Sequence, residues 1–321
     1  MRYPPIEPYD QGLLDVGDGN QIHWETSGNA AGKPALVVHG GPGSGSSPGP
    51  RRSFDPQRYR IIGFDQRGCG RSVPHASDPG TDMGVNTTHH LIADMERLRE
   101  HLGVDRWLLF GGSWGATLSL AYAEQFPERV TEIILIAVTT GRHSEIEWLY
   151  DGVGRFFPEA WERFRDGVPA PERRGDLPAA YARLMEHADP AVRARAAHDW
   201  CAWEDAVLSL EGYGAPNPYG DRPDRGRLAF VRICTHYFSH RLWLPDDQMF
   251  TDVGRLAGIP GVLLHGRMDL SGPARNAWEL SRAWPDAEVT VFGGAGHKGS
   301  EAMGDALLAA TERFAPRRPA P

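Results

Sequence analysis

The sequence predicts an α/β protein whose mostly parallel, doubly wound sheet is interrupted by a helical insertion. Short, continuous apolar runs are typical of buried parallel strands, and they occur at 34–38, 59–64, 107–110 and 132–138. Helical periodicity separates some of these runs, and alternation of strand and helix favours a parallel sheet. Strand-like runs then vanish over about 100 residues and return near the end of the chain.

The first predicted strand, 22–26, follows the turn signal Gly-Asp-Gly-Asn at 17–20. The runs at 34–38 and 59–64 end in a glycine-rich loop, 39–43, and at Asp65. Between 88 and 102 the apolar residues recur every three or four positions, which predicts an amphipathic helix. A second helix is predicted over 116–126.

Between about 141 and 240 the chain is predicted to be helical. The expected helices cover 145–150, 158–164, 177–187, 190–210 and 226–240. Strands at 261–264 and 289–292 then return, with a helix over 274–283 between them. We therefore expect a core domain made of 1–140 and 241–321, and a helical cap domain made of 141–240. The Pro/Arg-rich tail, 315–321, is expected to fray.

Composition narrows the classes of function. Across 321 residues, 34 Lys+Arg and 42 Asp+Glu give a net charge of −8, which argues against a nucleic-acid partner. The densest apolar run spans 133–138, so neither a membrane span nor a signal peptide is expected. Three scattered cysteines suit a reduced, cytoplasmic protein. We expect no nucleotide cofactor and no metal, since His236 and His240 lack a third ligand.

Residues 111–115 read Gly-Gly-Ser-Trp-Gly, between a predicted strand and a predicted helix. A serine on such a turn is exposed as a nucleophile, so Ser113 is the candidate; an ordinary glycine-rich turn is the alternative. A serine hydroxyl needs a base, and the base needs an acid that fixes its tautomer. Asp269 and His297 follow successive predicted strands and complete the order Ser…Asp…His.

An acyl-transfer site also needs donors for the oxyanion. The backbone N–H of Trp114 is one candidate because it begins the helix after the nucleophile. The N–H of Gly41 is the second, since the loop after the first parallel strand usually supplies it.

The chain resembles the proline iminopeptidases, which are serine aminopeptidases of the α/β-hydrolase fold. The resemblance rests on segments 39–43, 65–72, 111–118, 200–204, 236–238, 266–269 and 294–297. It implies a Ser113, Asp269 and His297 triad under the helical cap. It also implies removal of an N-terminal residue, proline or another small one, from short peptides or aminoacyl amides through an acyl-enzyme. Segment 65–72 is expected to brace the oxyanion loop.

The resemblance also assigns the substrate pocket. Glu204 matches the glutamate that binds the substrate amine, and a solvated helix glutamate is the alternative. Tyr150 and Trp203 are expected to line the pocket, with packing inside the cap as the alternative for the tryptophan.

Several positions depart from the family. Cys234 stands where a second glutamate is usual, and the segment 136–139, from Ile136 to Thr139, lacks the usual arginine and phenylalanine. The cysteine that usually follows the acid is replaced within 270–273, and Lys298 stands where a small or hydroxyl residue is usual.

These departures motivate a second hypothesis that keeps the triad but changes the substrate. It is an amide, ester or thioester hydrolase, or an acyl transferase, acting on a small metabolite. A non-catalytic ligand-binding α/β protein is the third. The partner is therefore a small peptide or a small-molecule acyl substrate, and the sequence does not determine the oligomeric state.

Overall fold

The structure is a computed structural model of the chain that describes residues 2–317. Met1 and residues 318–321 lie outside the described part, and with them the end of the tail that was expected to fray. Within residues 2–317, no helix is both long enough and apolar enough to cross a membrane.

Within the described residues, one 8-stranded sheet forms the centre of the molecule, with the order β1-β2-β4-β3-β5-β6-β7-β8. The first two strands pair antiparallel with each other, and β2 pairs antiparallel with β4. All further pairs, from β4 to β8, are parallel. The strands are β1 (Asp10–Gly17), β2 (Asn20–Gly28), β3 (Lys33–Val38), β4 (Tyr59–Phe64), β5 (Trp107–Ser113), β6 (Val130–Val138), β7 (Gly261–Gly266) and β8 (Ala287–Phe292).

The side chains of each central strand alternate between two apolar layers, as the twofold period of a strand requires. Leu36 and Val38 of β3 belong to the larger layer, with α1 (Thr88–His101), α2 (Trp114–Gln125) and α9 (Arg275–Ala283). Ala35 and Val37 belong to the smaller layer, with α10 (Glu301–Phe314). The sheet is therefore covered on both faces, which is the arrangement that parallel strands need.

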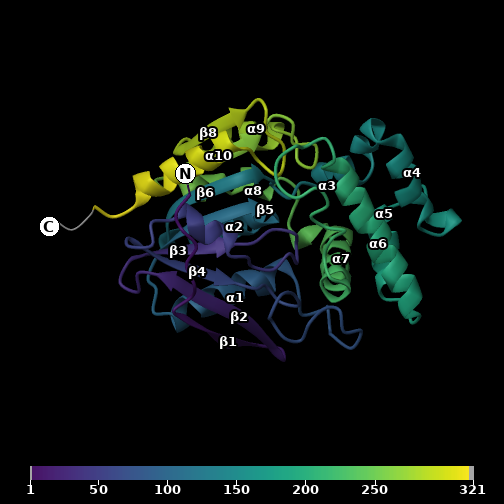
Figure 1. Cartoon of the computed structure of the whole chain (residues 1–321), viewed down its shortest axis with the longest axis horizontal. Helices are drawn as coiled ribbons and strands as arrows, with labels where there is room; N and C mark the ends of the chain where they lie inside the picture. The colour runs from purple at the N-terminus through teal and green to yellow at the C-terminus, as the bar shows by residue number, and fades with distance from the viewer. Residues whose placement is uncertain (1, 318–321) are drawn as a thin grey trace.

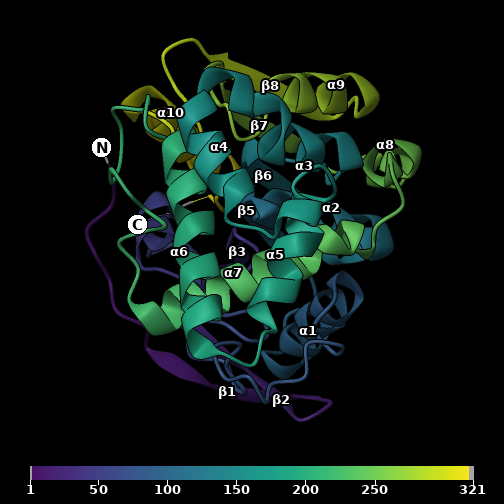
Figure 2. The same cartoon turned by 90° about the vertical axis from the view of Figure 1, so that its right-hand side faces the viewer.

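Between β6 and β7 the chain leaves the sheet and forms a set of helices. These are α3 (His143–Tyr150), α4 (Pro158–Asp166), α5 (Leu177–Met185), α6 (Pro190–Val207), α7 (Asp224–Ser239) and α8 (Gln248–Thr251). In Figure 1 helices α4 to α7 stand to one side of the sheet. Figure 2, turned by 90°, shows them in front of it. We keep the name cap for residues 141–240; its separation as a domain stays a prediction.

The predicted α/β fold with a mostly parallel sheet is confirmed, and three elements were missed, of which α8 is a single short turn of helix. Strand β1 has an irregular, acidic and glycine-containing sequence, and it is largely exposed at the edge of the sheet. Helix α10 has buried Met303 and Leu307 at helical spacing, and the Ser300 hydroxyl caps it by accepting from the Met303 N–H at 3.2 Å. Three cap helices end earlier than predicted, at Met185, Val207 and Ser239.

Candidate active site

Ser113 lies at the junction between β5 and α2, on a backbone with φ 56° and ψ −127°. A positive φ is strained for a residue with a side chain, and such strain is common at functional sites. The flanking glycines make the turn possible. A Cβ at Gly111 would lie 2.2 Å from the carbonyl oxygen of Gly115, and a Cβ at Gly115 would lie 2.2 Å from that of Val38. The turn therefore presents the Ser113 hydroxyl at the carboxyl edge of the sheet.

The predicted base and acid lie beside this serine. His297 Nε2 is 3.1 Å from Ser113 Oγ, and His297 Nδ1 is 2.9 Å from Asp269 Oδ2. The second oxygen of Asp269 accepts from the Gly272 N–H at 2.9 Å. Asp269 follows β7 and His297 follows β8, so three loops at one edge of a parallel sheet bring the three side chains together. Both distances are in the range of the hydrogen bonds that link a nucleophilic serine to its base and the base to its acid.

The imidazole of His297 and the carboxylate of Asp269 shift each other's pKa. Burial alone would lower the pKa of His297, but the carboxylates of Asp269, Glu211 and Glu204 together outweigh burial and raise that pKa to about 9. Burial would also raise the pKa of Asp269, yet His297 and the Gly272 amide hold it below its usual value. Asp269 therefore stays ionised and can fix the tautomer and orientation of the ring.

A second histidine supports the acid, and the sequence reasoning did not identify it. His265 is fully buried at the end of β7. Its Nδ1 accepts from the Val138 N–H at 2.9 Å, so its Nε2 carries the proton and donates to the Gly272 carbonyl at 2.8 Å. Burial lowers the pKa of His265 and keeps the ring neutral. His265 thus ties the end of β6 to the loop that carries Asp269.

The two expected oxyanion donors, Gly41 and Trp114, line the same cavity as Ser113. Gln66 connects their two segments. Its side-chain N–H donates to the His39 carbonyl at 2.9 Å, and its side-chain carbonyl accepts from the Trp114 indole N–H at 3.0 Å. The segment 65–72 therefore packs against the oxyanion loop as expected.

The cavity above Ser113 is small, with room for water-sized groups in about 60 Å³, and it is formed by core and cap residues together. It is lined by Gly41, Ser113, Trp114, Thr117, Thr139, Gly141, Arg142, Glu145, Ile146, Leu149, Tyr150, Glu204, Tyr219, Phe238, Leu242, Ser271 and His297. A mostly apolar cavity with a few convergent polar groups is typical of a small-molecule site.

Glu204 is a buried carboxylate in this cavity rather than a solvated helix residue. Its side chain accepts a hydrogen bond from the Tyr150 hydroxyl at 2.7 Å. Burial raises the pKa of Glu204 to about 7, and the Tyr150 hydrogen bond and the nearby His297 limit that rise. A buried carboxylate of this kind is stabilised by a cation that enters the cavity.

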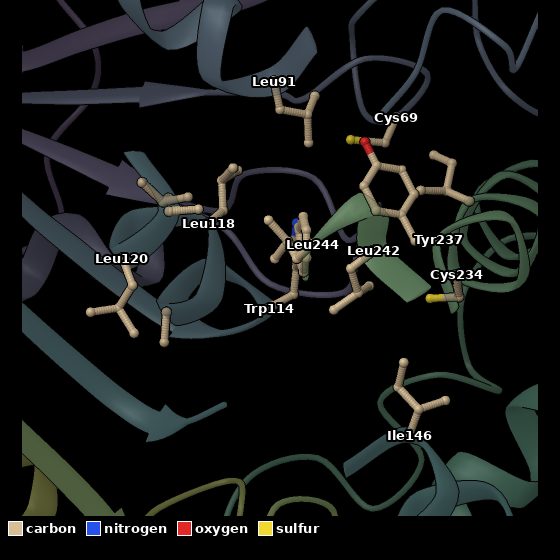
Figure 3. Close-up of a cluster of buried hydrophobic side chains, with 14 of the residues drawn as sticks. Cys69, Leu91, Trp114, Leu118, Leu120, Ile146, Cys234, Tyr237, Leu242 and Leu244 are labelled. Carbon is tan, nitrogen blue, oxygen red and sulfur yellow. The ribbon is translucent and has the colours of Figure 1, made fainter. Parts of the chain in front are cut away.

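Of three further residues that the sequence placed in the pocket, one lines the cavity and two lie elsewhere. Thr139 lines the cavity and donates through its hydroxyl to the Ser113 carbonyl at 2.8 Å. Among the described residues that line the cavity, neither Trp203 nor Cys234 occurs. Trp203 packs in the cap interior, stacked on Phe164. Cys234 donates to the Pro42 carbonyl at 3.2 Å, and Figure 3 shows it among buried apolar side chains. Both therefore lie behind the cavity wall.

The cavity also contains a carboxylate that sequence reasoning missed. Glu145 accepts from the backbone N–H groups of Thr140 at 3.1 Å and of Arg142 at 3.4 Å. Its oxygens are therefore engaged at the start of α3, whereas the Glu204 carboxylate accepts from the Tyr150 hydroxyl. Among residues 2–317, no group of three or more His, Cys, Asp or Glu side chains is arranged to hold a metal ion.

Comparisons with known proteins show which family the chain is similar to. Residues 33–301 match the model of the alpha/beta hydrolase fold family. A probable proline iminopeptidase of Streptomyces coelicolor is 51% identical, over 98% of this chain and 97% of that protein. A proline iminopeptidase of Xylella fastidiosa is 44% identical, over 97% and 98%. The solved structure of a proline iminopeptidase-related protein from Thermus thermophilus has a TM-score of 0.56 at 24% identity, covering 95% of this chain and 96% of that one.

Proposed function

This chain belongs to the alpha/beta hydrolase fold family and, within it, to the proline iminopeptidases, and from that membership we propose that it is a serine aminopeptidase of short peptides. It removes one N-terminal residue, proline or another small one, through an acyl-enzyme. The observation that carries the proposal is the joint presence, in one cavity, of the hydrogen-bonded Ser113 and His297 and of the buried Glu204 carboxylate.

In the first half of the reaction, Ser113 Oγ attacks the carbonyl carbon of the N-terminal residue while its proton passes to His297 Nε2. Asp269 stabilises the imidazolium, and the N–H groups of Gly41 and Trp114 stabilise the oxyanion. When the C–N bond breaks, His297 gives the proton to the leaving amine. The acyl group then remains on Ser113 as an ester.

In the second half, water attacks this ester and loses a proton to His297, which returns it to Ser113 Oγ as the free amino acid leaves. Glu204 binds the substrate ammonium throughout. Desolvating an unpaired ammonium is costly, so the carboxylate selects a free N-terminus. The apolar cap residues Ile146, Leu149 and Phe238 line the rest of the cavity.

A comparison of three substrates tests the proposal. The three substrates are prolyl-naphthylamide, alanyl-naphthylamide and p-nitrophenyl acetate. We expect the protein to release naphthylamine from the first two, and we expect Ser113→Ala to abolish this release. p-Nitrophenyl acetate reports ester turnover without a substrate amine. The proposal is wrong if the protein releases nothing from any of the three substrates and is not labelled by a fluorophosphonate.

A second candidate keeps the triad but acts on a small metabolite that has no free amine. The observation that favours it is the residue at position 234, where the family usually has a second glutamate. Here the residue is Cys234, and its thiol donates a hydrogen bond to the Pro42 carbonyl. The same comparison separates the two candidates, because ester turnover without release from the aminoacyl amides supports the second.

A further inference from the structure

The turn that carries His297 is held by a side chain from the cap. Residues 296–299 form a turn closed by the Gly299 N–H and the Gly296 carbonyl at 3.1 Å. The two central amides of this turn donate to one carboxylate. The His297 N–H is 2.8 Å from Glu211 Oε1, and the Lys298 N–H is 2.7 Å from Glu211 Oε2. Glu211 lies in the loop between α6 and α7, 86 positions from His297.

The contact is close and reciprocal. A Cβ at Gly296 would lie 2.2 Å from Glu211 Cδ, so only a glycine allows the carboxylate to reach the turn. In return, the Lys298 ammonium donates to the carbonyls of Glu211 at 2.9 Å and of Ala215 at 3.1 Å. Two charged side chains thus connect the same two loops in opposite directions, through hydrogen bonds that the charges strengthen.

This connection begins on the helix that also holds the amine-binding carboxylate. Glu204 lies near the end of α6, and the chain passes from there directly to Glu211. The Leu208 N–H still bonds the Glu204 carbonyl at 3.3 Å, and the Glu211 N–H bonds the Leu208 carbonyl at 3.1 Å. Short, hydrogen-bonded turns therefore join the residue that binds substrate to the residue that holds the base.

We propose that Glu211 is a positioning residue for His297, which fixes the imidazole from the cap through the backbone N–H groups of the catalytic turn. The inference rests on the proposed triad and extends it. A displacement of the base of about 1 Å is enough to cost roughly 100-fold in rate, so a carboxylate that holds two adjacent amides is well placed to affect catalysis. Lys298 strengthens the same connection from the other side, through its hydrogen bonds to the cap loop.

Because Glu211 is charged, it should affect the pKa of His297, which a purely structural contact would not do. The charged and titratable groups around His297 are Asp269, Glu204 and Glu211, with His265 and Lys298 beyond them. Glu211 is one of the carboxylates that raise the pKa of His297. Its removal should therefore lower that pKa, in addition to loosening the turn.

The test compares Glu211→Gln with Asp205→Asn. Asp205 is a matched control because its carboxylate also accepts two amides of the cap loop, those of Tyr219 at 3.0 Å and Gly220 at 2.7 Å, without contacting the turn 296–299. The readout is the second-order rate of labelling by a fluorophosphonate between pH 6 and pH 10. This probe has no amine, so Glu204 does not contribute to its binding.

We expect Glu211→Gln to lower the high-pH labelling rate by roughly 10- to 100-fold and to move the midpoint of the pH profile to lower pH. Asp205→Asn should leave that midpoint unchanged. Equal profiles for wild type and Glu211→Gln, or equal shifts in both variants, would overturn the inference. If Glu211→Gln does not fold, Lys298→Met should reduce the high-pH rate in the same direction. An unlabelled wild-type protein would instead contradict the proposed function.

Discussion

The two walls of the active-site cavity are built in different ways. On the core wall, Ser113, Asp269 and His297 lie at the ends of parallel strands, and hydrogen bonds fix each of them. On the cap wall, apolar side chains surround the buried carboxylate of Glu204, which meets the Tyr150 hydroxyl. We infer that the sheet supplies most of the bond-breaking geometry, to which the cap adds the hold of Glu211 on the His297 turn, and that the rest of the cap wall selects the substrate. The predictions below test this division between the core wall and the cap wall.

The largest effect is expected on the core wall. Asp269→Asn should lower kcat by about 1,000- to 10,000-fold for amide and ester substrates alike, because the amide favours the wrong tautomer of His297. Steady-state kinetics with alanyl-naphthylamide and p-nitrophenyl acetate measures this loss, and a thermal melt checks that the variant is folded. A folded variant that loses less than about tenfold would remove Asp269 from its role.

On the cap wall, Glu204→Gln should act on one class of substrate. The neutral amide cannot balance the substrate ammonium, so kcat/KM for alanyl-naphthylamide should fall about 10- to 100-fold. For p-nitrophenyl acetate, which has no amine, kcat/KM should change by less than about twofold. An equal loss for both substrates would mean that Glu204 supports the fold or the triad instead of selecting an amine.

The pH dependence should separate the two walls in the wild-type protein. His297 must be neutral to act as a base, and its pKa is raised to about 9, so kcat/KM should fall as pH drops below 9 for every substrate. Glu204 must be ionised to bind an ammonium, and its pKa is raised to about 7. Below pH 7 the loss should therefore steepen for alanyl-naphthylamide but not for p-nitrophenyl acetate. The same steepening with both substrates would contradict the assignment.

The smallest effect is expected behind the cap wall, at Cys234. Because its thiol bonds the Pro42 carbonyl away from the cavity, Cys234→Ala should change KM for alanyl-naphthylamide by less than about twofold. The variant should lose about 1 kcal/mol of unfolding free energy, as small buried deletions do. A denaturant melt measures the loss of stability. A large rise in KM would show that Cys234 contacts the substrate.

The sequence predicted the core wall better than the cap wall, for a physical reason. A nucleophile on a strand-to-helix turn needs glycines at fixed positions, so Ser113 could be found locally. The acid and base then follow from strand order, because neighbouring parallel strands end at one edge. Glu204 was found only through resemblance to a family, since no local pattern marks a helix glutamate as buried.

Two of the residues that the sequence reasoning missed, Glu211 and His265, act across long separations, whereas the third, Glu145, bonds backbone amides within five positions. Glu211 bonds the amide of a residue 86 positions away, and His265 bonds an amide 127 positions away. Neither contact leaves a periodic or motif signal in the chain. Trp203 shows the opposite difficulty. It lies next to Glu204 in sequence, but adjacent helical positions point in different directions, so its ring packs inside the cap.

The loop that carries His297 follows β8, the outermost strand of the sheet, which pairs with β7. Edge strands with one neighbour open locally at a lower free energy than central strands do. In rising denaturant, fraying of this strand would carry the proton acceptor away from its serine while the central strands keep their amide protection. Inactivation would then precede global unfolding. The hydrogen bonds that Glu211 and Lys298 make between the cap and this loop would set how far apart the two transitions lie.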